Sequence, residues 1–226
     1  MRVLSWNLKH GRAVPSAGRD LFDEFASALA RWEWDVALLQ EVPPWWPRLF
    51  GEHLHADWRL VLTSRNFGLS LRRALATRWP DVVRSNGGGS NAVLVRDEDR
   101  IVEQRSLRLT LRPERRWLLA VRLSSGVWVG TVHLTGGATR AATREALAAS
   151  RTMLEWSGGA PVVLGGDFNL RSLALPGFRW IGGFHVDHLF AHGFERSGAV
   201  EVLERGRLSD HAPIAANLTP AARPGS

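Results

Sequence analysis

The chain contains no cysteine and no tyrosine, and Lys9 is its single lysine. Without cysteine the protein has no disulfide bond, no thiolate metal site and no thiol nucleophile. No apolar run approaches the ~18 residues that a membrane-spanning helix needs. The N-terminus begins with a strand-like segment and shows no secretion signal. We therefore expect a cytoplasmic protein without a membrane span.

The remaining composition is that of an ordinary folded protein with a basic surface. Its 226 residues are 45% hydrophobic and 23% charged, which suits one large domain with a sizeable core. We expect a single domain over residues 1–219, a disordered tail over residues 220–226, and a monomer. The formal net charge of +7 favours a phosphate-bearing or polyanionic partner, although a merely solvated basic surface would carry the same charge.

Apolar periodicity predicts short strands that alternate with a few helices. Residues 19–33 have the spacing of an amphipathic helix, and a long helix from about Ala142 ends at Gly158. Residues 66–79 are expected to form a weaker helix or an arginine-rich loop. Strands are expected at residues 35–39, 59–63, 91–96, 101–110, 115–123, 127–134, 161–164, 185–190, 198–203 and 212–218.

This element order mixes hairpins with strand–helix–strand units. Short turns between the strands from residue 91 to residue 134 indicate antiparallel pairing. The mixture excludes a purely parallel, doubly wound sheet. Two packed mixed sheets with helices outside would bury these apolar strands on both faces.

The most informative stretch is Val162–Asn169, with the sequence VVLGGDFN. In extended backbone, residues i and i+2 point to the same side, so Asp167 and Asn169 would face one site. Gly165 and Gly166 would let the backbone turn sharply or approach a ligand closely. The same residues would also suit an Asx-rich turn that only closes a strand.

Further polar residues follow apolar strands in the same way. Each one alone has a common structural explanation, such as a turn residue, a solvated strand end, a core histidine or a cap. Together they suit metal-assisted hydrolysis of a phosphoester. These residues are Asn7, Glu41, His133, Asp187, Asp210 and His211.

A magnesium ion would fit this set, because Mg²⁺ prefers oxygen ligands and keeps several waters, so that one or two carboxylates suffice. Mn²⁺ would substitute for it. Glu41 is the best ligand candidate, helped by Asn7 and Asp210. The cation would polarise the phosphoryl oxygens and stabilise the leaving oxygen. Asp167 would orient and deprotonate the attacking water, and Asn169 would donate hydrogen bonds to the transition state.

The histidines would bind the phosphate or exchange protons. His133 and His211 are the candidates, and Asp187 is the natural partner of His211, because an adjacent carboxylate raises the pKa of a histidine. Asp210 and His211 are neighbours whose side chains diverge in extended backbone. One of them could therefore reach the metal and the other the phosphate.

Taken in chain order, these motifs resemble those of the endonuclease/exonuclease/phosphatase superfamily. The resemblance spans residues 3–214 and implies the DNase-I-like fold, an α/β four-layer sandwich of two packed, mixed, mainly antiparallel sheets flanked by helices. It also implies a divalent-metal phosphoesterase. The motifs are Ser5-Trp6-Asn7, Leu39-Gln40-Glu41, Asn91-Ala92-Val93-Leu94, Thr131-Val132-His133-Leu134, Gly165-Gly166-Asp167-Phe168-Asn169, Val186-Asp187-His188 and Ser209-Asp210-His211-Ala212-Pro213.

The resemblance gives the same roles to these residues as the chemistry does. His133 resembles the second phosphate-facing histidine of the nuclease and sphingomyelinase branches, and Asp210 resembles the acidic residue that precedes the catalytic histidine. Contacts to the substrate phosphate are expected from Asn91, Arg115 and Arg116.

Two departures weaken a specific assignment as an AP endonuclease. Lys9 stands where those branches carry an acidic residue, two places after the first asparagine. The active-site tyrosine of those and of DNase-type nucleases has no counterpart. Neither departure touches the hydrolytic core.

DNA is the leading substrate class, with endonuclease or exonuclease activity. Arginine-rich segments at residues 65–84 and 105–116 would track a phosphate backbone. Trp45, Trp46 or Trp79 would be available to stack on bases, although core or surface packing is the favoured interpretation of these tryptophans.

Two other functions stay open. A phosphatase or phosphodiesterase of a nucleotide, an inositol phosphate or a sphingomyelin-like lipid headgroup would use the same core motifs. A non-catalytic nucleic-acid-binding module would not need a water-orienting set of residues. The glycine loop Asn86–Ser90 would either pass close to a phosphate or form a hairpin turn.

Overall fold

The computed structural model describes residues 1–63, 66, 68, 70, 73–75, 89–96, 99–112 and 114–221. Most of the expected helix or loop at residues 66–79, the basic segment 65–84 and the tail lie outside these residues. In chain order the main elements are β1 (Arg2–Asn7), η1 (Lys9–Gly11), α1 (Phe22–Arg31), β2 (Val36–Val42), α2 (Trp46–Leu54), β3 (Ala56–Leu62), β4 (Ser90–Arg96), β5 (Ile101–Thr110), β6 (Arg116–Leu123), β7 (Trp128–His133), α5 (Thr139–Ser157), β8 (Val162–Asp167), β9 (Arg179–Phe184), β10 (Asp187–His192), β11 (Phe194–Val202) and β12 (Ile214–Pro220).

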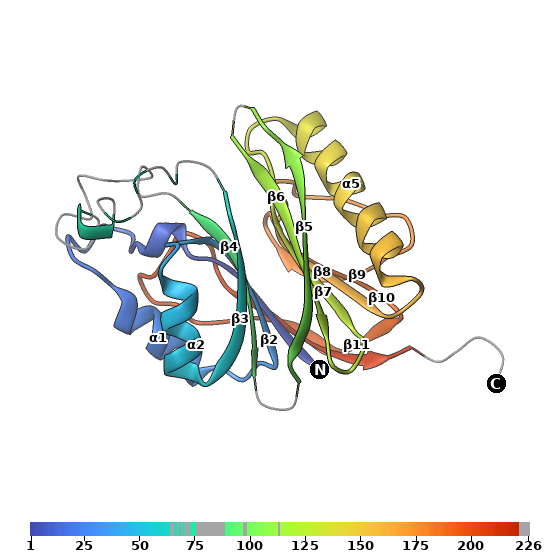
Figure 1. Cartoon of the computed structure of the whole chain (residues 1–226), viewed down its shortest axis with the longest axis horizontal. Helices are drawn as coiled ribbons and strands as arrows, with labels where there is room; N and C mark the ends of the chain where they lie inside the picture. The colour runs from blue at the N-terminus through green and yellow to red at the C-terminus, as the bar shows by residue number, and fades with distance from the viewer. Residues whose placement is uncertain are drawn as a thin grey trace.

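The described strands form two six-stranded sheets, with the orders β11-β12-β1-β2-β4-β3 and β5-β6-β7-β8-β10-β9. In each sheet one central pair is parallel, β1 with β2 and β7 with β8. The other paired strands run antiparallel. Helices α1 and α2 lie against the first sheet and α5 against the second (Figure 1). The predicted four-layer α/β sandwich is confirmed.

Alternate residues of the central strands face opposite layers of this sandwich. In β1, Val3 packs between the two sheets and Leu4 packs under the helices. In β8, Val163 faces the other sheet and Leu164 faces α5. Because both faces are buried, the strands read as continuous apolar runs. None of the helices in the described ranges is long and apolar enough to cross a membrane.

Helix α2 is an element that the sequence analysis missed. Pro47 lies in its first turn, where a missing N–H loses no hydrogen bond. Trp46, Phe50 and Leu54 recur every four residues and are all buried. Trp46 is therefore a core residue, which confirms the packing interpretation and excludes Trp46 from stacking on bases. Trp45 is partly buried against the same core, and Trp79 lies outside the described residues.

The strand boundaries near the predicted site also differ from expectation. β2 continues through Gln40 and Glu41 to Val42, with an irregularity in its pairing to β4. The strand expected at residues 185–190 is the second arm of a hairpin, and its first arm, β9, was not foreseen. The glycines Gly182 and Gly183 in β9 weaken its strand pattern.

Candidate active site

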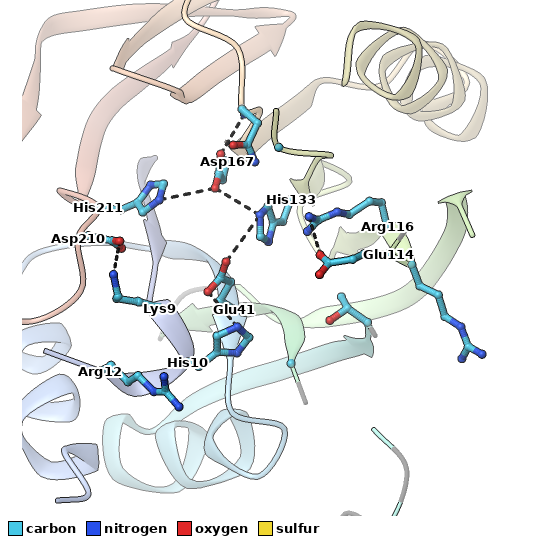
Figure 2. Close-up of a pocket in the computed structure, with 15 residues that line it drawn as sticks. Lys9, His10, Arg12, Glu41, Glu114, Arg116, His133, Asp167, Asp210 and His211 are labelled. Atoms are coloured by element: carbon cyan, nitrogen blue, oxygen red, sulfur yellow. Dashed lines mark hydrogen bonds and ion pairs between the residues drawn. The ribbon is translucent and has the colours of Figure 1, made fainter. Parts of the chain in front are cut away.

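The polar residues that end the central strands gather at one edge of the two sheets. Asn7 pairs with Gln40 in the first sheet, and Asp167 lies in register with both His133 and Asp187 in the second. A cavity of about 520 Å³ opens there (Figure 2). Its lining consists of Lys9, His10, Arg12, Glu41, Thr63, Gly89, Glu114, Arg115, Arg116, His133, Gly136, Asp167, Asn169, Asp210 and His211.

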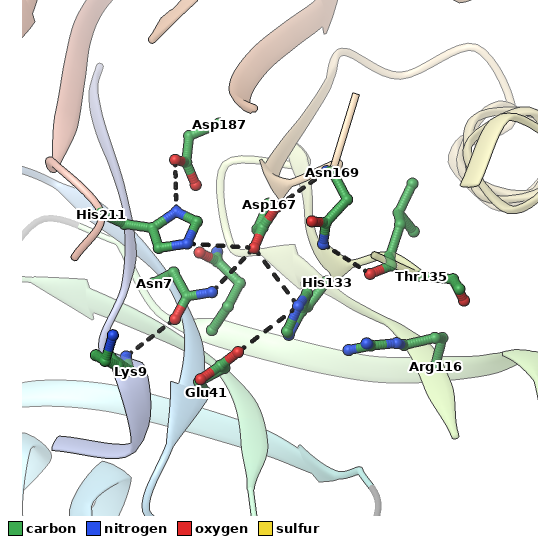
Figure 3. A network of polar contacts seen from close by, with 12 residues as sticks. Asn7, Lys9, Glu41, Arg116, His133, Thr135, Asp167, Asn169, Asp187 and His211 are labelled. Carbon is green, nitrogen blue, oxygen red and sulfur yellow. Dashed lines mark hydrogen bonds and ion pairs between the residues drawn. The ribbon is translucent and has the colours of Figure 1, made fainter. Parts of the chain in front are cut away.

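Asp167 lies at the centre of this arrangement (Figure 3). Its carboxylate Oδ2 accepts a hydrogen bond of 3.0 Å from Asn7 Nδ2 and lies 3.5 Å from His133 Nε2 and 3.8 Å from His211 Nε2. Burial, and next the charge of Asp187, raise the pKa of Asp167 to about 7. A carboxylate with this pKa accepts a proton from water at neutral pH far better than an ordinary aspartate.

The two glycines before Asp167 serve strand packing rather than close approach of a ligand. A Cβ atom on Gly166, whose φ is +139°, would lie 2.0 Å from the carbonyl oxygen of Val132. A Cβ atom on Gly165 would lie 2.5 Å from Leu189 Cδ2. Side chains at these positions would push β8 away from its neighbours, and Asp167 would move with it.

Asn169 does not continue the extended backbone of β8, which ends at Asp167. Its φ of 53° is left-handed, and its backbone N–H donates to Asp167 Oδ1 over 2.9 Å. This is an Asx turn, so the proposed i, i+2 alignment was wrong although both side chains line the cavity. Asn169 Nδ2 donates to the carbonyl of Leu134 over 2.9 Å, which fixes the amide at the cavity wall.

His211 and Asp187 form a hydrogen-bonded pair, as the sequence suggested. Asp187 Oδ2 lies 2.8 Å from His211 Nδ1. Burial opposes the charge of the imidazolium, but the hydrogen bond and charge of Asp187 outweigh it and raise the pKa of His211 to about 9. Burial raises the pKa of Asp187 itself. His211 therefore carries a proton at neutral pH and turns Nε2 towards Asp167.

Three further hydrogen bonds hold the loop that carries His211. Ser209 Oγ donates to the carbonyl of Asn7 over 2.6 Å and accepts the backbone N–H of His211 over 3.1 Å. Trp6 Nε1 donates to the carbonyl of His211 over 3.0 Å. The first and last motifs of the chain are thereby tied to each other.

Lys9 is a site residue whose role the sequence analysis did not foresee. Its ammonium group forms an ion pair with Asp210, and its backbone N–H donates to Asn7 Oδ1 over 3.0 Å. Although burial opposes it, the hydrogen bond from Lys9 lowers the pKa of Asp210. Asp210 thus already has a cationic partner in the place where it was expected to help bind a metal.

Glu41 faces the same cavity from β2, with a left-handed φ of 49°. Its Oε2 lies 3.1 Å from His10 Nε2, and its Oε1 lies 3.7 Å from His133 Nε2. Burial, followed by the charge of Arg116, lowers the pKa of His133 well below its usual range. His133 is therefore neutral. The sequence analysis missed His10; its place three residues after Asn7 and directly before Gly11 was the available signal.

Two buried polar side chains support the site from behind. Gln40 Nε2 donates to Thr131 Oγ1 over 2.9 Å and so links the two sheets beneath Glu41. Glu145 of α5 accepts the backbone N–H of Thr135 over 2.8 Å and its hydroxyl over 2.7 Å. The only sequence signal for Glu145 was a carboxylate on the alanine-rich face of a helix.

Of the three residues expected to contact the substrate phosphate, two line the cavity and one does not. Arg115 and Arg116 line the cavity, and Arg116 Nη2 lies 2.9 Å from Glu114 Oε2. Asn91 is buried, does not line the cavity, and donates from Nδ2 to the carbonyl of Trp117 over 3.1 Å. The sheet interior therefore holds Asn91 back from a substrate. Gly89 of the expected glycine loop does line the cavity.

A family model described as "Endonuclease/Exonuclease/phosphatase family" matches residues 4–211. The chain belongs to the endonuclease/exonuclease/phosphatase family. It is a metal-dependent phosphoesterase. No curated protein sequence is similar enough to this phosphoesterase to count as a match.

Several solved structures share the fold of this phosphoesterase. An endonuclease/exonuclease/phosphatase from Beutenbergia cavernae is 18% identical, with a TM-score of 0.74 over 100% of this chain and 73% of that one. D. rerio TDP2 complexed with a single-strand DNA product is 17% identical, with a TM-score of 0.70 over 97% and 98%. The Bacteroides thetaiotaomicron mannosyl-6-phosphatase Bt3783 is 17% identical, with a TM-score of 0.65 over 97% and 99%.

The donor atoms of the cavity fit a divalent cation. Glu41 and Asp167 offer carboxylates, and the amide oxygen of Asn7 has one lone pair beyond its bond to Lys9. Donor atoms of Asp167, Asp187 and His211 lie within 4.8 Å of one another and could also hold an ion. In that group, however, His211 and Asp187 are bonded to each other.

Proposed function

We propose that this phosphoesterase hydrolyses phosphodiester bonds in DNA. The observation that carries the proposal is a basic rim that continues beyond the cavity. Arg115 and Arg116 line the cavity where β6 begins, and Arg112 and Arg108 are exposed on the same β5–β6 hairpin. A row of arginines of this kind suits a polyanion that extends past one phosphate. The single-strand DNA product bound by D. rerio TDP2 supports the proposal.

The hydrolytic step follows from the protonation states of the site. Glu41 would hold a divalent ion, whose charge would polarise the phosphoryl oxygens. Asp167, with a pKa of about 7, orients the attacking water and accepts its proton. His211, with a pKa of about 9, presents Nε2–H to the charge that develops on the phosphate. The Asn169 amide adds a neutral donor to the same oxygens.

The buried carboxylates of Asp167 and Asp187 favour a catalytic function over a function in binding alone. A binding module needs positive charge, not a carboxylate buried beside a second carboxylate. Asp167 and Asp187 are each 2% exposed. Burying two neighbouring carboxylates destabilises the folded state, so their presence points to a functional role. We therefore do not favour the non-catalytic nucleic-acid-binding module.

Hydrolysis of a small phosphate ester is the second candidate. The cavity of about 520 Å³ falls within the range of small-molecule sites. The mannosyl-6-phosphatase Bt3783 shares the fold. Arg116 and His133 at the cavity wall would serve a monoester and a diester equally well.

A substrate panel separates the two candidates. The purified protein with Mg²⁺ or Mn²⁺ is given single-stranded, plasmid and abasic DNA, RNA, phosphoinositides, and nucleotide and sugar monophosphates. We expect DNA to be cleaved at least about tenfold faster, as kcat/KM, than any monoester, and EDTA to abolish cleavage. Turnover of monoesters alone would favour the second candidate. Undiminished turnover in EDTA would refute the metal mechanism for both.

A further inference from the structure

Lys9 is the single lysine of a chain whose other basic side chains, histidine apart, are arginines. It lines the cavity together with Asp210, and the two form an ion pair. Figure 2 shows this pair on one side of the cavity and the pair of Arg116 with Glu114 on the opposite side. The Lys9 side chain is 34% exposed and that of Arg116 is 12% exposed. Of these two cations, Lys9 is therefore the more accessible.

Hydrogen bonds tie Lys9 to the residues that surround Asp167. The backbone N–H of Lys9 donates to Asn7 Oδ1 over 3.0 Å, and Asn7 Nδ2 donates to Asp167 Oδ2 over 3.0 Å. Asp210, which holds the ammonium group, directly precedes His211 in the chain. His211 Nε2 in turn lies 3.8 Å from the same Oδ2 atom. The backbone and the side chain of Lys9 are thus both connected to the site.

Stability alone does not account for this arrangement. Lys9 has a φ of 48°, in the left-handed region that residues with a side chain rarely adopt. Such a conformation costs free energy. The ion pair returns little of it, because side chains that are 34% and 48% exposed form only a weak surface ion pair. A non-glycine residue held in this way is typical of a functional site.

The chemistry of an ammonium group suits a phosphate oxygen at this position. It carries three N–H donors, so a bond to one carboxylate oxygen of Asp210 leaves donors for a substrate. It is also a compact point charge, whereas a guanidinium group is larger and planar. In a chain that otherwise uses arginine, the lysine at position 9 indicates a place where the compact charge is needed.

We propose that Lys9 is a further catalytic residue, whose ammonium group binds a non-bridging oxygen of the substrate phosphate on the side of His211, and that Asp210 positions Lys9 instead of binding the metal. The inference rests on the phosphoester hydrolysis proposed above and adds a second cation to that side of the cavity. Two positive charges there would offset the negative charge that develops on the phosphate as water attacks. The contact serves a diester and a monoester alike, so it holds for either substrate class.

Steady-state kinetics with Mg²⁺, on the substrate of the panel that is cleaved fastest, test the contact. Lys9→Met should lower kcat/KM by about 10²-fold. Calorimetry should show that its Mg²⁺ affinity changes less than about threefold, because an ammonium group is not a ligand. Lys9→Arg keeps the charge and should recover part of the lost activity. Near-wild-type kcat/KM in Lys9→Met would overturn the proposal and leave the proposed function intact.

Arg48→Met is the matched control for Lys9→Met. It also removes one positive charge and one ion pair, that of Arg48 with Glu52, but this pair lies on α2 and does not line the cavity. We expect kcat/KM to stay within about twofold of the wild type. A loss equal to that of Lys9→Met would overturn the proposal, because it would trace the effect to net charge alone.

A double-mutant cycle tests the role of Asp210. Asp210→Asn alone should lower kcat/KM about tenfold, and in the Lys9→Met background it should have less than about a twofold effect, because it acts through Lys9. Its Mg²⁺ affinity should stay within about threefold of the wild type. Losses that multiply, or a loss of Mg²⁺ binding in Asp210→Asn, would overturn the proposal. Thermal melting checks that each variant is folded.

Chemical labelling gives a readout that does not depend on turnover. Because Lys9 is the single lysine, reductive methylation modifies one side-chain amine, and mass spectrometry measures its extent. Substrate bound to the Asp167→Asn variant should slow the methylation of Lys9 but not that of the N-terminal amine, which does not line the cavity. Bound substrate that leaves Lys9 equally reactive would overturn the proposal. A wild-type protein that cleaves no phosphoester of the panel would contradict the proposed function itself.

Discussion

Asp167 combines deep burial with a position among several polar side chains. It is 2% exposed, and Asn7, His133 and His211 all approach its Oδ2 atom. Its pKa is raised because burial and the neighbouring Asp187 both oppose its negative charge. A group of this kind weakens the folded state at the pH where it is useful for catalysis. Activity and stability should therefore change in opposite directions when it is replaced.

Asp167→Asn should lower kcat by about 10²–10⁴-fold, because the amide cannot accept a proton from water. The pKa of Asp167 is raised to about 7, so the carboxylate weakens the fold increasingly as the pH rises from about 4 to above 7. At pH 8 the metal-free variant should therefore be more stable than the wild type, by about 1–3 kcal/mol. Thermal melting and steady-state kinetics measure both effects.

Glu155→Gln, at an exposed position of α5, is the control for Asp167→Asn. It should change neither kcat nor the stability at pH 8. Near-wild-type kcat in Asp167→Asn would contradict the proposal that Asp167 accepts the proton of the attacking water. A loss of stability at pH 8 would show instead that the carboxylate is structural.

His211 should titrate far above an ordinary histidine in the metal-free protein, at a pKa of about 9. Because its folded pKa lies above the unfolded value of about 6.5, its stabilising effect is complete below pH 6.5 and is lost as the pH rises through 9. Asp187→Asn removes the charge that raises the pKa. NMR of the imidazole protons should then show titration at a clearly lower pH, with a flatter stability profile between pH 7 and 9. An unchanged titration would contradict the pairing.

Among the elements, the short turn η1 connects the core to the site. Lys9, His10 and Gly11 all have positive φ, at 48°, 53° and 73°. The Trp46 ring lies directly against Gly11, so packing against α2 fixes the position of the turn. The first of these residues reaches Asp210 and the second reaches Glu41. A core tryptophan thereby positions two cavity side chains without lining the cavity itself.

Gly11→Ala should destabilise the protein by about 2–4 kcal/mol, from left-handed strain plus overpacking against Trp46. Gly126→Ala is the matched control: its φ is also positive, at 87°, but nothing lies within 4 Å of the added Cβ atom. The control should cost only about 1 kcal/mol and leave kcat unchanged, whereas Gly11→Ala should also lower kcat. Denaturant unfolding and kinetics measure the difference, and equal effects would exclude a steric role for Trp46.

For the whole molecule, the important feature is that each sheet contributes half of the site. Asn7 and Glu41 come from the first sheet, and His133, Asp167 and Asp187 come from the second. The two halves meet because the apolar faces of the sheets pack against each other. The net charge of +7 adds a field over the whole surface that attracts polyanions.

If DNA is the substrate, affinity for a single strand should fall steeply with salt. Contacts to three or four phosphates predict a slope of about −2 to −3 in log K against log salt concentration. Fluorescence anisotropy with the Asp167→Asn variant avoids turnover during the measurement. Replacing Arg108 and Arg112 by alanine should make the slope shallower, with Arg151→Ala on α5 as the control. Salt-insensitive binding would favour the small-molecule substrate.

The elements differ in how well the sequence predicts them. β5 was expected at residues 101–110, as observed, because its ends coincide with turn residues. Helix α2 was missed because the preceding Pro43-Pro44 pair indicates a break in regular structure. The sequence alone also does not distinguish a buried Trp46 from an exposed one. Asn91 shows the converse, a motif residue that the sheet interior holds by a hydrogen bond to Trp117.

The sequence by itself determined the family, the layered sandwich and the strand ends that carry polar residues, because apolar periodicity and short motifs are local properties of the chain. Only the tertiary structure decided which of those residues meet. Asn7 and Asp167 are 160 positions apart and share a hydrogen bond, and Lys9 reaches Asp210 across 201 positions. Such contacts depend on sheet register and packing, and so do the burial and neighbouring charges that raise the pKa of Asp167. Local patterns do not encode them.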